Sequence, residues 1–111
     1  MHQGANNIDD GPLLFVMSNL TTLEVNIEEQ YVWVGPGLNW GQVYSYLAQF
    51  NLTAAGGRLF PVGVPGLLLG GGMNAHGNQH GFAADNVIEY EVVLAVGSIK
   101  SVTAKSNPDL F

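Results

Sequence analysis

The pattern of apolar and polar residues predicts several short strands in the first third of the chain. Leu13 to Met17 is a continuous apolar run, which predicts a buried strand. Leu23 to Ile27 alternates apolar and polar residues, which predicts a half-buried strand. Tyr31 to Val34 (YVWV) predicts another, and Glu28 to Gln30 between them suits a turn. We therefore expect the second and third of these strands to form a hairpin.

A helix is predicted next. Apolar side chains recur at the spacing i, i+3, i+4, i+7, which places them on one helix face. The residues on this face are Trp40, Val43, Tyr44 and Leu47. Asn39 is expected to be the N-cap, and Gln42 at position N3 completes a variant of the capping box. The helix should end near Phe50 and Asn51.

The last part of the chain predicts a further pair of strands. Leu52 to Ala55 is expected to be a short strand or an extended segment. Val87 to Ala95 is rich in β-branched residues and predicts a strand, and Val96-Gly97 turns it into another at Ile99 to Thr103. Asn107 to Phe111 (NPDLF) suits the opening turn of a helix. A helix mixed with hairpins indicates an α+β fold rather than a doubly wound one.

A glycine-rich apolar stretch separates these parts. Gly63 to Gly72 reads GVPGLLLGGG, with five glycines and one proline. In a helix interior each Gly costs about 1 kcal/mol relative to Ala, and Pro about 3 kcal/mol, and Pro also disfavours a central strand. The composition therefore predicts a loop whose backbone closely approaches another group, with its N–H groups facing an anion and Leu67 to Leu69 beside a flat apolar ring. Tight packing of a short helix on a sheet, without a ligand, explains the same composition equally well.

Two common nucleotide-binding motifs are missing from this stretch. No Lys follows Gly72, so the stretch is not a P-loop. No G-x-G-x-x-G follows a strand, so the Rossmann fingerprint is missing as well.

Composition narrows the possible partners. The chain has 111 residues, enough for one domain or part of one, and only 11% are charged, against about a quarter in typical domains. This low charge indicates a surface that a partner, a cofactor or the rest of a larger protein normally covers. The net charge of −6 argues against nucleic-acid binding. No apolar run reaches the length of roughly 20 residues that a membrane helix needs, so no membrane partner is expected.

The ends of the chain and its sequons give little information on localisation. Residues 1 to 12 are polar and end in the turn signal Asp10-Gly11-Pro12, and a helix start at the C-terminus adds to the expectation of a piece of a longer chain. No signal peptide is visible. The sequons at Asn19 and Asn51 permit glycosylation if the protein is secreted, so the localisation stays open.

The polar residues do not form a convincing catalytic set. His76 and His80 are four residues apart, but the intervening Gly77 to Gln79 is a poor helix and no nearby carboxylate completes a metal site. A histidine beside a cofactor, or exposed to solvent, fits better. Arg58 either meets a phosphate or carboxylate ligand or pairs with an acidic side chain. The chain has no cysteine, so a cofactor would have to carry the chemistry.

Four ordered segments carry a family resemblance over essentially the whole chain. They are VGPGLNWGQVYSYL, AAGGRLFPVGVPGLLLGGG, HGFAADNVIEYEVVLAVGSI and NPDLF. In this order and spacing they resemble the FAD-binding (PCMH-type) domain of FAD-linked oxidoreductases of the vanillyl-alcohol oxidase type, nearest to the berberine bridge enzyme-like oxidases common in fungi. The resemblance implies that residues 1–111 form a partial FAD-binding domain, mainly its second subdomain, with a mixed or antiparallel sheet and flanking helices. It also implies that both ends are incomplete and that the substrate domain is absent.

The resemblance also implies a cofactor and its contacts. In that family the glycine loop wraps the FAD pyrophosphate and approaches the isoalloxazine ring. By position, this role falls to Val62, Gly63, Val64, Gly66, Leu67, Gly70 and Gly71. Gly81 and Ile99 match positions that line the flavin and the adenosine. The expected partners are FAD and, in the intact protein, a small-molecule substrate.

The sequence departs from the family at positions that matter for covalent attachment of the flavin. His2 lacks the Gly-rich context of the family's flavin-linked histidine, so the covalent role is not transferred to it. Leu59 stands where bicovalent members carry a cysteine, and Val96 stands where an Asp is common. No catalytic base is identified among these residues.

The sequence thus predicts part of a flavin-dependent oxidase that passes a hydride from an alcohol, sugar or amine to FAD, with O2 as the final oxidant. The alternative is a non-catalytic flavin-binding or interaction module that kept the fold and lost the chemistry.

Overall fold

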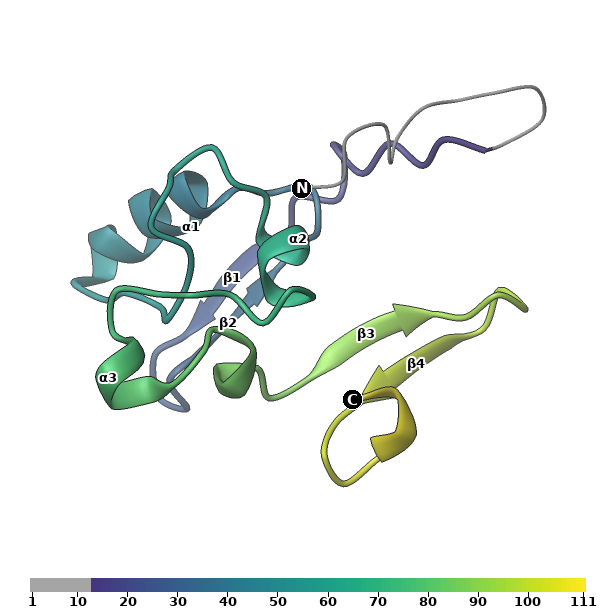
Figure 1. Cartoon of the computed structure of the whole chain (residues 1–111). Helices are drawn as coiled ribbons and strands as arrows, with labels where there is room; N and C mark the ends of the chain where they lie inside the picture. Colours follow the sequence, from purple (N-terminus) through teal and green to yellow (C-terminus); the bar gives the residue numbers. More distant parts are fainter. Residues whose placement is uncertain (1–12) are drawn as a thin grey trace.

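The structure is a computed structural model that describes residues 13–111 (Figure 1). Its strands form two separate two-stranded antiparallel sheets, and helices and turns connect them, so the predicted α+β class is confirmed. The strands are β1 (Leu23–Asn26), β2 (Tyr31–Val34), β3 (Tyr90–Val93) and β4 (Ile99–Val102). The helices are α1 (Trp40–Leu47), α2 (Val64–Leu68) and α3 (Gly77–His80), and the 3-10 turns are η1 (Ala48–Phe50), η2 (Ala84–Asn86) and η3 (Pro108–Leu110).

Strands β1 and β2 form the first predicted hairpin. Leu23 lies opposite Val34 and Val25 opposite Val32, so these apolar side chains share one face of the hairpin. The Asn26 side chain closes the turn by accepting a hydrogen bond from the Glu29 N–H at 3.0 Å. Ile27 belongs to the turn rather than to the strand and is 56% exposed.

Helix α1 begins and ends where the sequence predicts. The Asn39 side chain accepts from the Gln42 N–H at 3.0 Å, and the Gln42 side chain accepts from the Asn39 N–H at 2.9 Å, which confirms the capping box. The helix tightens into η1 and stops at Asn51, whose φ of 57° is left-handed and incompatible with continuing the helix.

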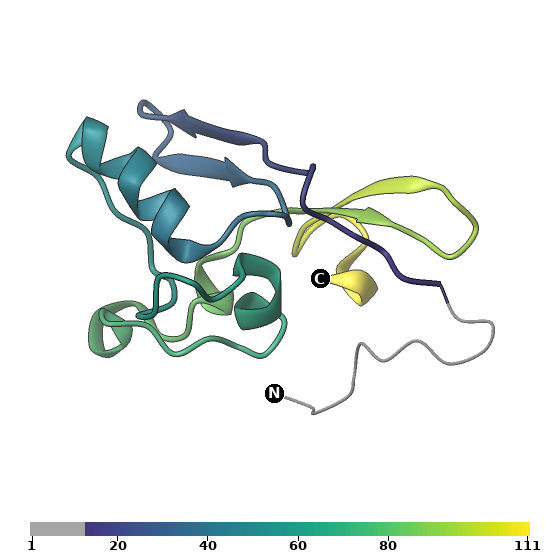
Figure 2. The same ribbon diagram turned by 90° about the horizontal axis from the view of Figure 1, so that it is seen from above.

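The core lies where α1 meets the β1–β2 hairpin and α2. The buried residues of this cluster are Leu38, Trp40, Val43, Leu47 and Val64. Apolar side chains of β1, β2 and α2 pack around them, half-buried. Figure 2 shows α1 running along the hairpin, with the β3–β4 hairpin extending to the other side. This cluster therefore fixes the position of α2 relative to the first sheet.

The second hairpin is shorter than predicted. Tyr90 pairs with Val102 and Val93 with Ile99, and the chain reverses at Gly97, which has a φ of 79° and donates its N–H to the Leu94 carbonyl at 2.8 Å. The predicted strand from Val87 begins only at Tyr90, because β4 ends at Val102 and offers the earlier residues no partner.

The prediction of a buried strand at Leu13 to Met17 is wrong. This segment has no regular structure, and Leu13 and Phe15 are 83% and 78% exposed. An apolar run becomes a strand only when a neighbouring strand accepts its hydrogen bonds, and neither sheet of the described region extends to it. Of the two alternatives for Leu52 to Ala55, a short strand or an extended segment, the structure excludes the strand. The turn predicted at Asp10 to Pro12 and the comments on His2 lie outside the described residues.

The prediction that Gly63 to Gly72 avoids helix is also wrong in part, because Val64–Leu68 forms the short helix α2. Pro65 lies in its first turn, where no N–H is needed for an intrahelical bond. Val64 is 4% exposed and joins the core, which offsets the cost of Gly66 inside the helix. A single helical turn also forms at Gly77–His80, where a helix was considered poor.

Among residues 13–111 no helix is long and apolar enough to cross a membrane.

The first prediction concerns the packing of Trp40. A Cβ on Gly56 would lie 1.9 Å from Trp40 Cζ3, whereas a Cβ on Gly63 would meet no atom within 4 Å. Neither glycine has a positive φ, so Gly56→Ala tests packing alone. We expect it to lower the free energy of unfolding by about 1–3 kcal/mol, measured by urea denaturation without ligand. Gly63→Ala is the control and should change it by less than about 0.5 kcal/mol; equal effects would refute the assigned packing.

Candidate functional site

The glycine stretch is tied at its start to the beginning of α1. Trp40 donates its N–H to the Val62 carbonyl at 3.0 Å, and Val64 donates to the Leu38 carbonyl at 3.0 Å. Gly41 donates to the Phe60 carbonyl, also at 3.0 Å. Backbone hydrogen bonds on both sides of Gly63 therefore place α2 beside the N-terminus of α1.

Trp40 and two glycines form the support beneath this segment. Gly56 and Gly57 are buried against the Trp40 ring, and a Cβ on Gly57 would lie 2.7 Å from Trp40 Cδ1 and 2.8 Å from Leu67 Cδ1. The Trp40 ring also stacks on Tyr44, with centroids 5.7 Å apart. The buried Trp40 Nε1 has no hydrogen-bond partner among the described residues.

The glycines of the predicted site fall into two groups. A Cβ on Gly63, Gly66 or Gly71 would meet no atom within 4 Å, so packing among the described residues does not require their lack of a side chain. A Cβ on Gly72 would instead lie 2.4 Å from Leu67 Cδ2. Internal packing therefore explains Gly72, whereas the close approach of a ligand to the rest of the stretch stays a prediction. We refer to Gly63, Gly66 and Gly71, where an added side chain would meet open space, as the open edge.

The backbone at the end of the stretch is held in a special conformation. Gly71 and Gly72 have φ angles of 85° and 73°, which residues with a side chain rarely adopt. Their carbonyls accept hydrogen bonds from the N–H groups of Ala84 at 3.0 Å and Ala83 at 2.7 Å. These bonds connect the glycine stretch to the segment that contains Gly81.

The structure places eight of the nine predicted site residues in one region. They are Val62, Gly63, Val64, Gly66, Leu67, Gly70, Gly71 and Gly81, which lie on α2, its flanks and the adjoining segment. Ile99 begins β4 and is 64% exposed on the hairpin that projects from the body (Figure 1), so it is not brought to the others. Gly81 has a φ of 71°, and a Cβ there would lie 2.5 Å from Asp85 Oδ2, so glycine is required there for backbone and packing reasons. The cofactor contacts themselves remain a prediction for all nine residues.

Exposed apolar side chains lie close to the open edge in sequence. Leu69 is 81% exposed, Met73 is 67% exposed and Phe82 is 56% exposed, and they flank Gly70 to Gly72 and Gly81 in sequence. Positions without a side chain, next to exposed apolar side chains, suit a ligand with a flat apolar ring that approaches the main chain closely.

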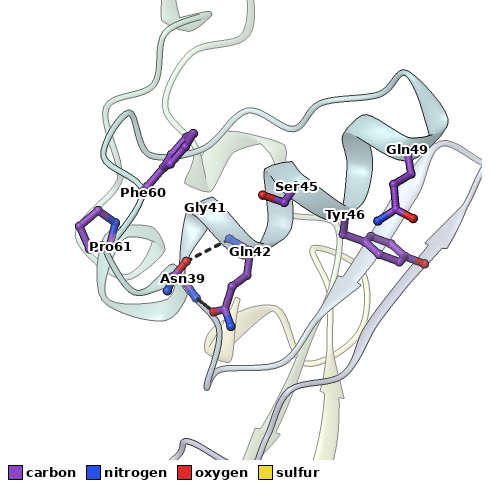
Figure 3. A pocket seen from close by; sticks show the side chains of 8 residues that line it. All are labelled: Asn39, Gly41, Gln42, Ser45, Tyr46, Gln49, Phe60 and Pro61. Atoms are coloured by element: carbon purple, nitrogen blue, oxygen red, sulfur yellow. Dashed lines mark hydrogen bonds between the residues drawn. The ribbon is translucent and has the colours of Figure 1, made fainter.

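Two other features do not belong to this region. An open groove of about 620 Å³ runs along the outer side of α1 (Figure 3), and the residues that line it are Asn39, Gly41, Gln42, Ser45, Tyr46, Gln49, Phe60 and Pro61. None of the nine predicted site residues is among them. The rings of His76 and His80 lie edge to face with centroids 6.4 Å apart, and residues 13–111 contain no group of three or more side chains that could hold a metal ion.

Sequence reasoning missed the residues that support this region. Trp40 was assigned only to a helix face, and the Gly56-Gly57 pair that accommodates its ring was not connected to it. Asn74 was not noticed, although its amide donates to the Gly81 carbonyl at 2.7 Å. The signal available was the presence of Asn74 and Asp85-Asn86 on either side of Gly81, since such residues hydrogen-bond nearby backbone in turns.

Comparisons with known proteins identify the family of this α+β domain. Residues 2–103 match the FAD binding domain family, and the chain belongs to this family. It is similar to the FAD-dependent monooxygenase tpcD of Cochliobolus heterostrophus, with 46% identity over 97% of this chain and 21% of that protein. The cofactor of the family is FAD, as the resemblance implied.

Solved structures support the same family. The xylooligosaccharide oxidase from Myceliophthora thermophila C1 superposes with a TM-score of 0.78 at 31% identity, over 86% of this chain and 20% of that chain. The wild-type BBE-like 1 protein of Physcomitrella patens gives a TM-score of 0.76 at 31% identity, over 85% and 21%. The chain thus spans about a fifth of the length of the relatives it matches. The relative from Cochliobolus heterostrophus is named an FAD-dependent monooxygenase and the one from Physcomitrella patens is named BBE-like 1, so the resemblance to FAD-linked oxidoreductases of the berberine bridge enzyme-like group is confirmed.

The residues present fit FAD. At the open edge, the positions that side chains on Gly63, Gly66 and Gly71 would occupy are empty, so a cofactor can approach the main chain closely there. Leu69 and Met73 offer apolar surface next to it. No basic residue lies in Gly63–Gly72, and the N–H groups of Gly70 and Gly71 already donate to the Leu67 and Leu68 carbonyls. A phosphate would therefore have to be bound by other backbone N–H groups of this stretch.

A second prediction concerns Tyr44, whose hydroxyl donates to the Gly57 carbonyl at 2.8 Å. Tyr44→Phe should lower the free energy of unfolding by about 0.5–1.5 kcal/mol. Burial raises the pKa of the Tyr44 hydroxyl above 10.0, so its contribution to stability is complete below pH 10 and is lost as the pH rises further. Urea denaturation between pH 8 and 11 should therefore show a weaker alkaline loss in the variant; identical pH profiles would contradict this role.

Proposed function

We propose that this chain supplies part of the FAD site of a flavin-dependent oxidase. The observation that carries the proposal is the open edge at Gly63, Gly66 and Gly71, which packing among the described residues does not explain. The two hydrogen bonds from Ala83 and Ala84 hold the end of this edge in its left-handed conformation before any ligand arrives. A preorganised backbone of this kind lowers the entropic cost of binding.

The glycines and the apolar side chains of this region have different roles in binding FAD. Gly63, Gly66 and Gly71 allow the cofactor to approach the main chain closely, whereas Leu67 packs beneath the edge, close to Gly57 and Gly72. Leu69 and Met73 shield the flat part of the ligand from water. When bound, FAD supplies the acceptor for a hydride from the substrate and passes the electrons on to O2. A substrate of the alcohol, sugar or amine class would be bound and deprotonated by other parts of the intact protein.

A monooxygenase is the second candidate, because the similar protein from Cochliobolus heterostrophus carries that name at 46% identity. The oxidase is favoured by two solved structures of the same fold, one of them named an oxidase. The two reactions differ in the fate of oxygen. With 18O2, an oxidase leaves no label in the organic product, whereas a monooxygenase inserts one labelled atom.

The third prediction tests whether the open edge contacts FAD, using a pair of matched variants. Gly71 and Gly97 both have positive φ, and both would leave an added Cβ without a neighbour within 4 Å. Gly71→Ala and Gly97→Ala should therefore cost similar free energies of unfolding without FAD, about 1–2 kcal/mol each. We expect only Gly71→Ala to weaken FAD binding, at least tenfold, because only there does the methyl group obstruct the cofactor.

FAD titration followed by flavin fluorescence measures the affinities, in the complete polypeptide that the gene encodes. In the parent and in Gly97→Ala, FAD at 100 times its dissociation constant should add about 2.7 kcal/mol to the free energy of unfolding. In Gly71→Ala the same FAD concentration should add much less. Equal FAD affinities in the two variants would show that the open edge is not the cofactor site.

The fourth prediction concerns covalent attachment. Leu59 is exposed and replaces the cysteine of bicovalent family members, and its side chain has no nucleophile. We expect no peptide of this chain to carry flavin after acid precipitation and proteolysis of the FAD-loaded protein. Mass spectrometry decides the matter; a flavin-bearing peptide that contains His76 or His80 would contradict the prediction.

A further inference from the structure

Asparagine side chains hydrogen-bond to the backbone of residues 80 to 82, in the segment that follows the glycine stretch. The carbonyls of His80, Gly81 and Phe82 each accept a hydrogen bond from an asparagine. Asn86 Nδ2 donates to the His80 carbonyl at 2.9 Å and to the Phe82 carbonyl at 2.8 Å. Asn74 Nδ2 donates to the Gly81 carbonyl at 2.7 Å. Successive carbonyls are therefore all fixed by two side chains.

The same segment is fastened through N–H groups as well. Asp85 Oδ2 accepts from the Phe82 N–H at 2.7 Å, and Asn74 Oδ1 accepts from the His76 N–H at 2.7 Å. We refer to Asn74, Asp85 and Asn86 together as the Asx clasp. Each member binds backbone rather than another side chain, so the clasp determines the path of the main chain from His76 to Phe82.

The clasp lies next to the open edge. Asn74 follows the glycine stretch directly and pairs with Gly57 through an isolated β-bridge, which links it to the support beneath α2. At the other end, Asp85 and Asn86 adjoin Ala84, whose N–H reaches the Gly71 carbonyl, and Ala83, whose N–H reaches the Gly72 carbonyl. Ala83 is 1% exposed. The conformation of Gly71 and Gly72 therefore depends on where the clasp places residues 83 and 84.

This dependence matters because a glycine has no side chain to anchor it. The left-handed conformation of Gly71 is one of several open to glycine. Two backbone hydrogen bonds hold it: the Gly71 N–H donates to the Leu68 carbonyl at 3.0 Å, and the Gly71 carbonyl accepts from the Ala84 N–H at 3.0 Å. If Ala84 moves away, Gly71 keeps only the bond from its N–H to the Leu68 carbonyl, and its carbonyl can then leave the orientation seen at the open edge. Many conformations of the edge would then compete, and FAD would have to select one of them at a cost in affinity.

We propose that Asn74, Asp85 and Asn86 are positioning residues for the FAD site. They hold residues 83 and 84 against the carbonyls of Gly71 and Gly72, and they act on the cofactor only through this backbone. The proposal rests on the proposed function, because it assumes that the open edge meets FAD. It assigns a role in binding to side chains that would otherwise count as ordinary turn residues.

Substitutions in the Asx clasp can remove or retain single hydrogen-bonding groups, so variants with strong and weak expected effects can be compared. Asn86→Asp keeps the shape of the side chain but replaces a donor that serves two carbonyls with a carboxylate that repels them. Asp85→Ala removes the acceptor for the Phe82 N–H, whereas Asp85→Asn retains an acceptor oxygen and should rescue binding. Asn26→Ala is the matched control, because Asn26 closes the β1–β2 turn through the same kind of bond, from the Glu29 N–H at 3.0 Å.

The fifth prediction compares these variants in the complete polypeptide that the gene encodes. FAD dissociation constants are measured by fluorescence titration, and free energies of unfolding by urea denaturation without FAD. We expect Asn86→Asp and Asp85→Ala to weaken FAD binding at least tenfold, and Asp85→Asn and Asn26→Ala to weaken it less than twofold. Without FAD, amide hydrogen exchange at Ala83 and Ala84 should accelerate in Asp85→Ala and stay unchanged in Asn26→Ala.

The outcomes separate the two proposals. A parent protein that binds no FAD refutes the proposed function. A parent that binds FAD, with Asp85→Ala binding as tightly, refutes the clasp alone. So does an equal loss of affinity in Asp85→Ala and Asn26→Ala, since the effect would then follow general stability. If Asn86→Asp does not fold, the comparison of Asp85→Ala with Asp85→Asn decides the question by itself.

Discussion

The packing of Trp40 against Gly56 and Gly57 is the constraint on which the rest of the site depends. The ring occupies the space that side chains at these two positions would fill, since a Cβ on Gly56 would lie 1.9 Å from it. Trp40 is also the first residue of α1, and its N–H binds the Val62 carbonyl. One residue thus joins the core, the start of the helix and the start of the glycine stretch.

This arrangement leaves the outer edge of the glycine stretch free. Leu67 faces inward, close to the positions that side chains on Gly57 and Gly72 would take, so the inner side of α2 is packed. Gly63, Gly66 and Gly71 have no such neighbours. A binding surface made of backbone needs this combination, because a rigid inner side keeps the outer side in one conformation while the absent side chains keep it accessible.

The sequence predicted the elements whose signals are local. The capping box of Asn39 and Gln42, the end of the helix near Asn51 and the turn at Gly97 all follow from residue chemistry within a few positions, and the structure confirms them. Leu13 to Met17 could not be predicted this way, because a strand depends on a partner elsewhere in the chain. Helix α2 was missed because burial of Val64 outweighs the poor propensity of Gly66, and burial is not visible in a local pattern.

The sequence predicted which stretch forms the candidate site but not the role of each glycine in it. Composition alone could not separate Gly72, which packs against Leu67, from Gly71, which faces open space. For the Asx clasp, the residue types on either side of Gly81 were a signal, but the bond partners were not predictable from it, because Asn74 and Gly81 meet through space across a helical turn. The family resemblance supplied the cofactor, and the structure supplies a physical reason why this backbone suits it.

Hydrogen exchange of the complete polypeptide, with and without FAD, tests most directly whether the glycine edge meets the cofactor. FAD should slow the exchange of amides between Val62 and Met73, where the open edge lies. The β1–β2 turn at Ile27 to Gln30 should exchange at the same rate in both samples and serves as an internal reference. Protection confined to segments outside Val62 to Met73, with the glycine amides unchanged by bound FAD, would contradict the assignment of the edge to the cofactor.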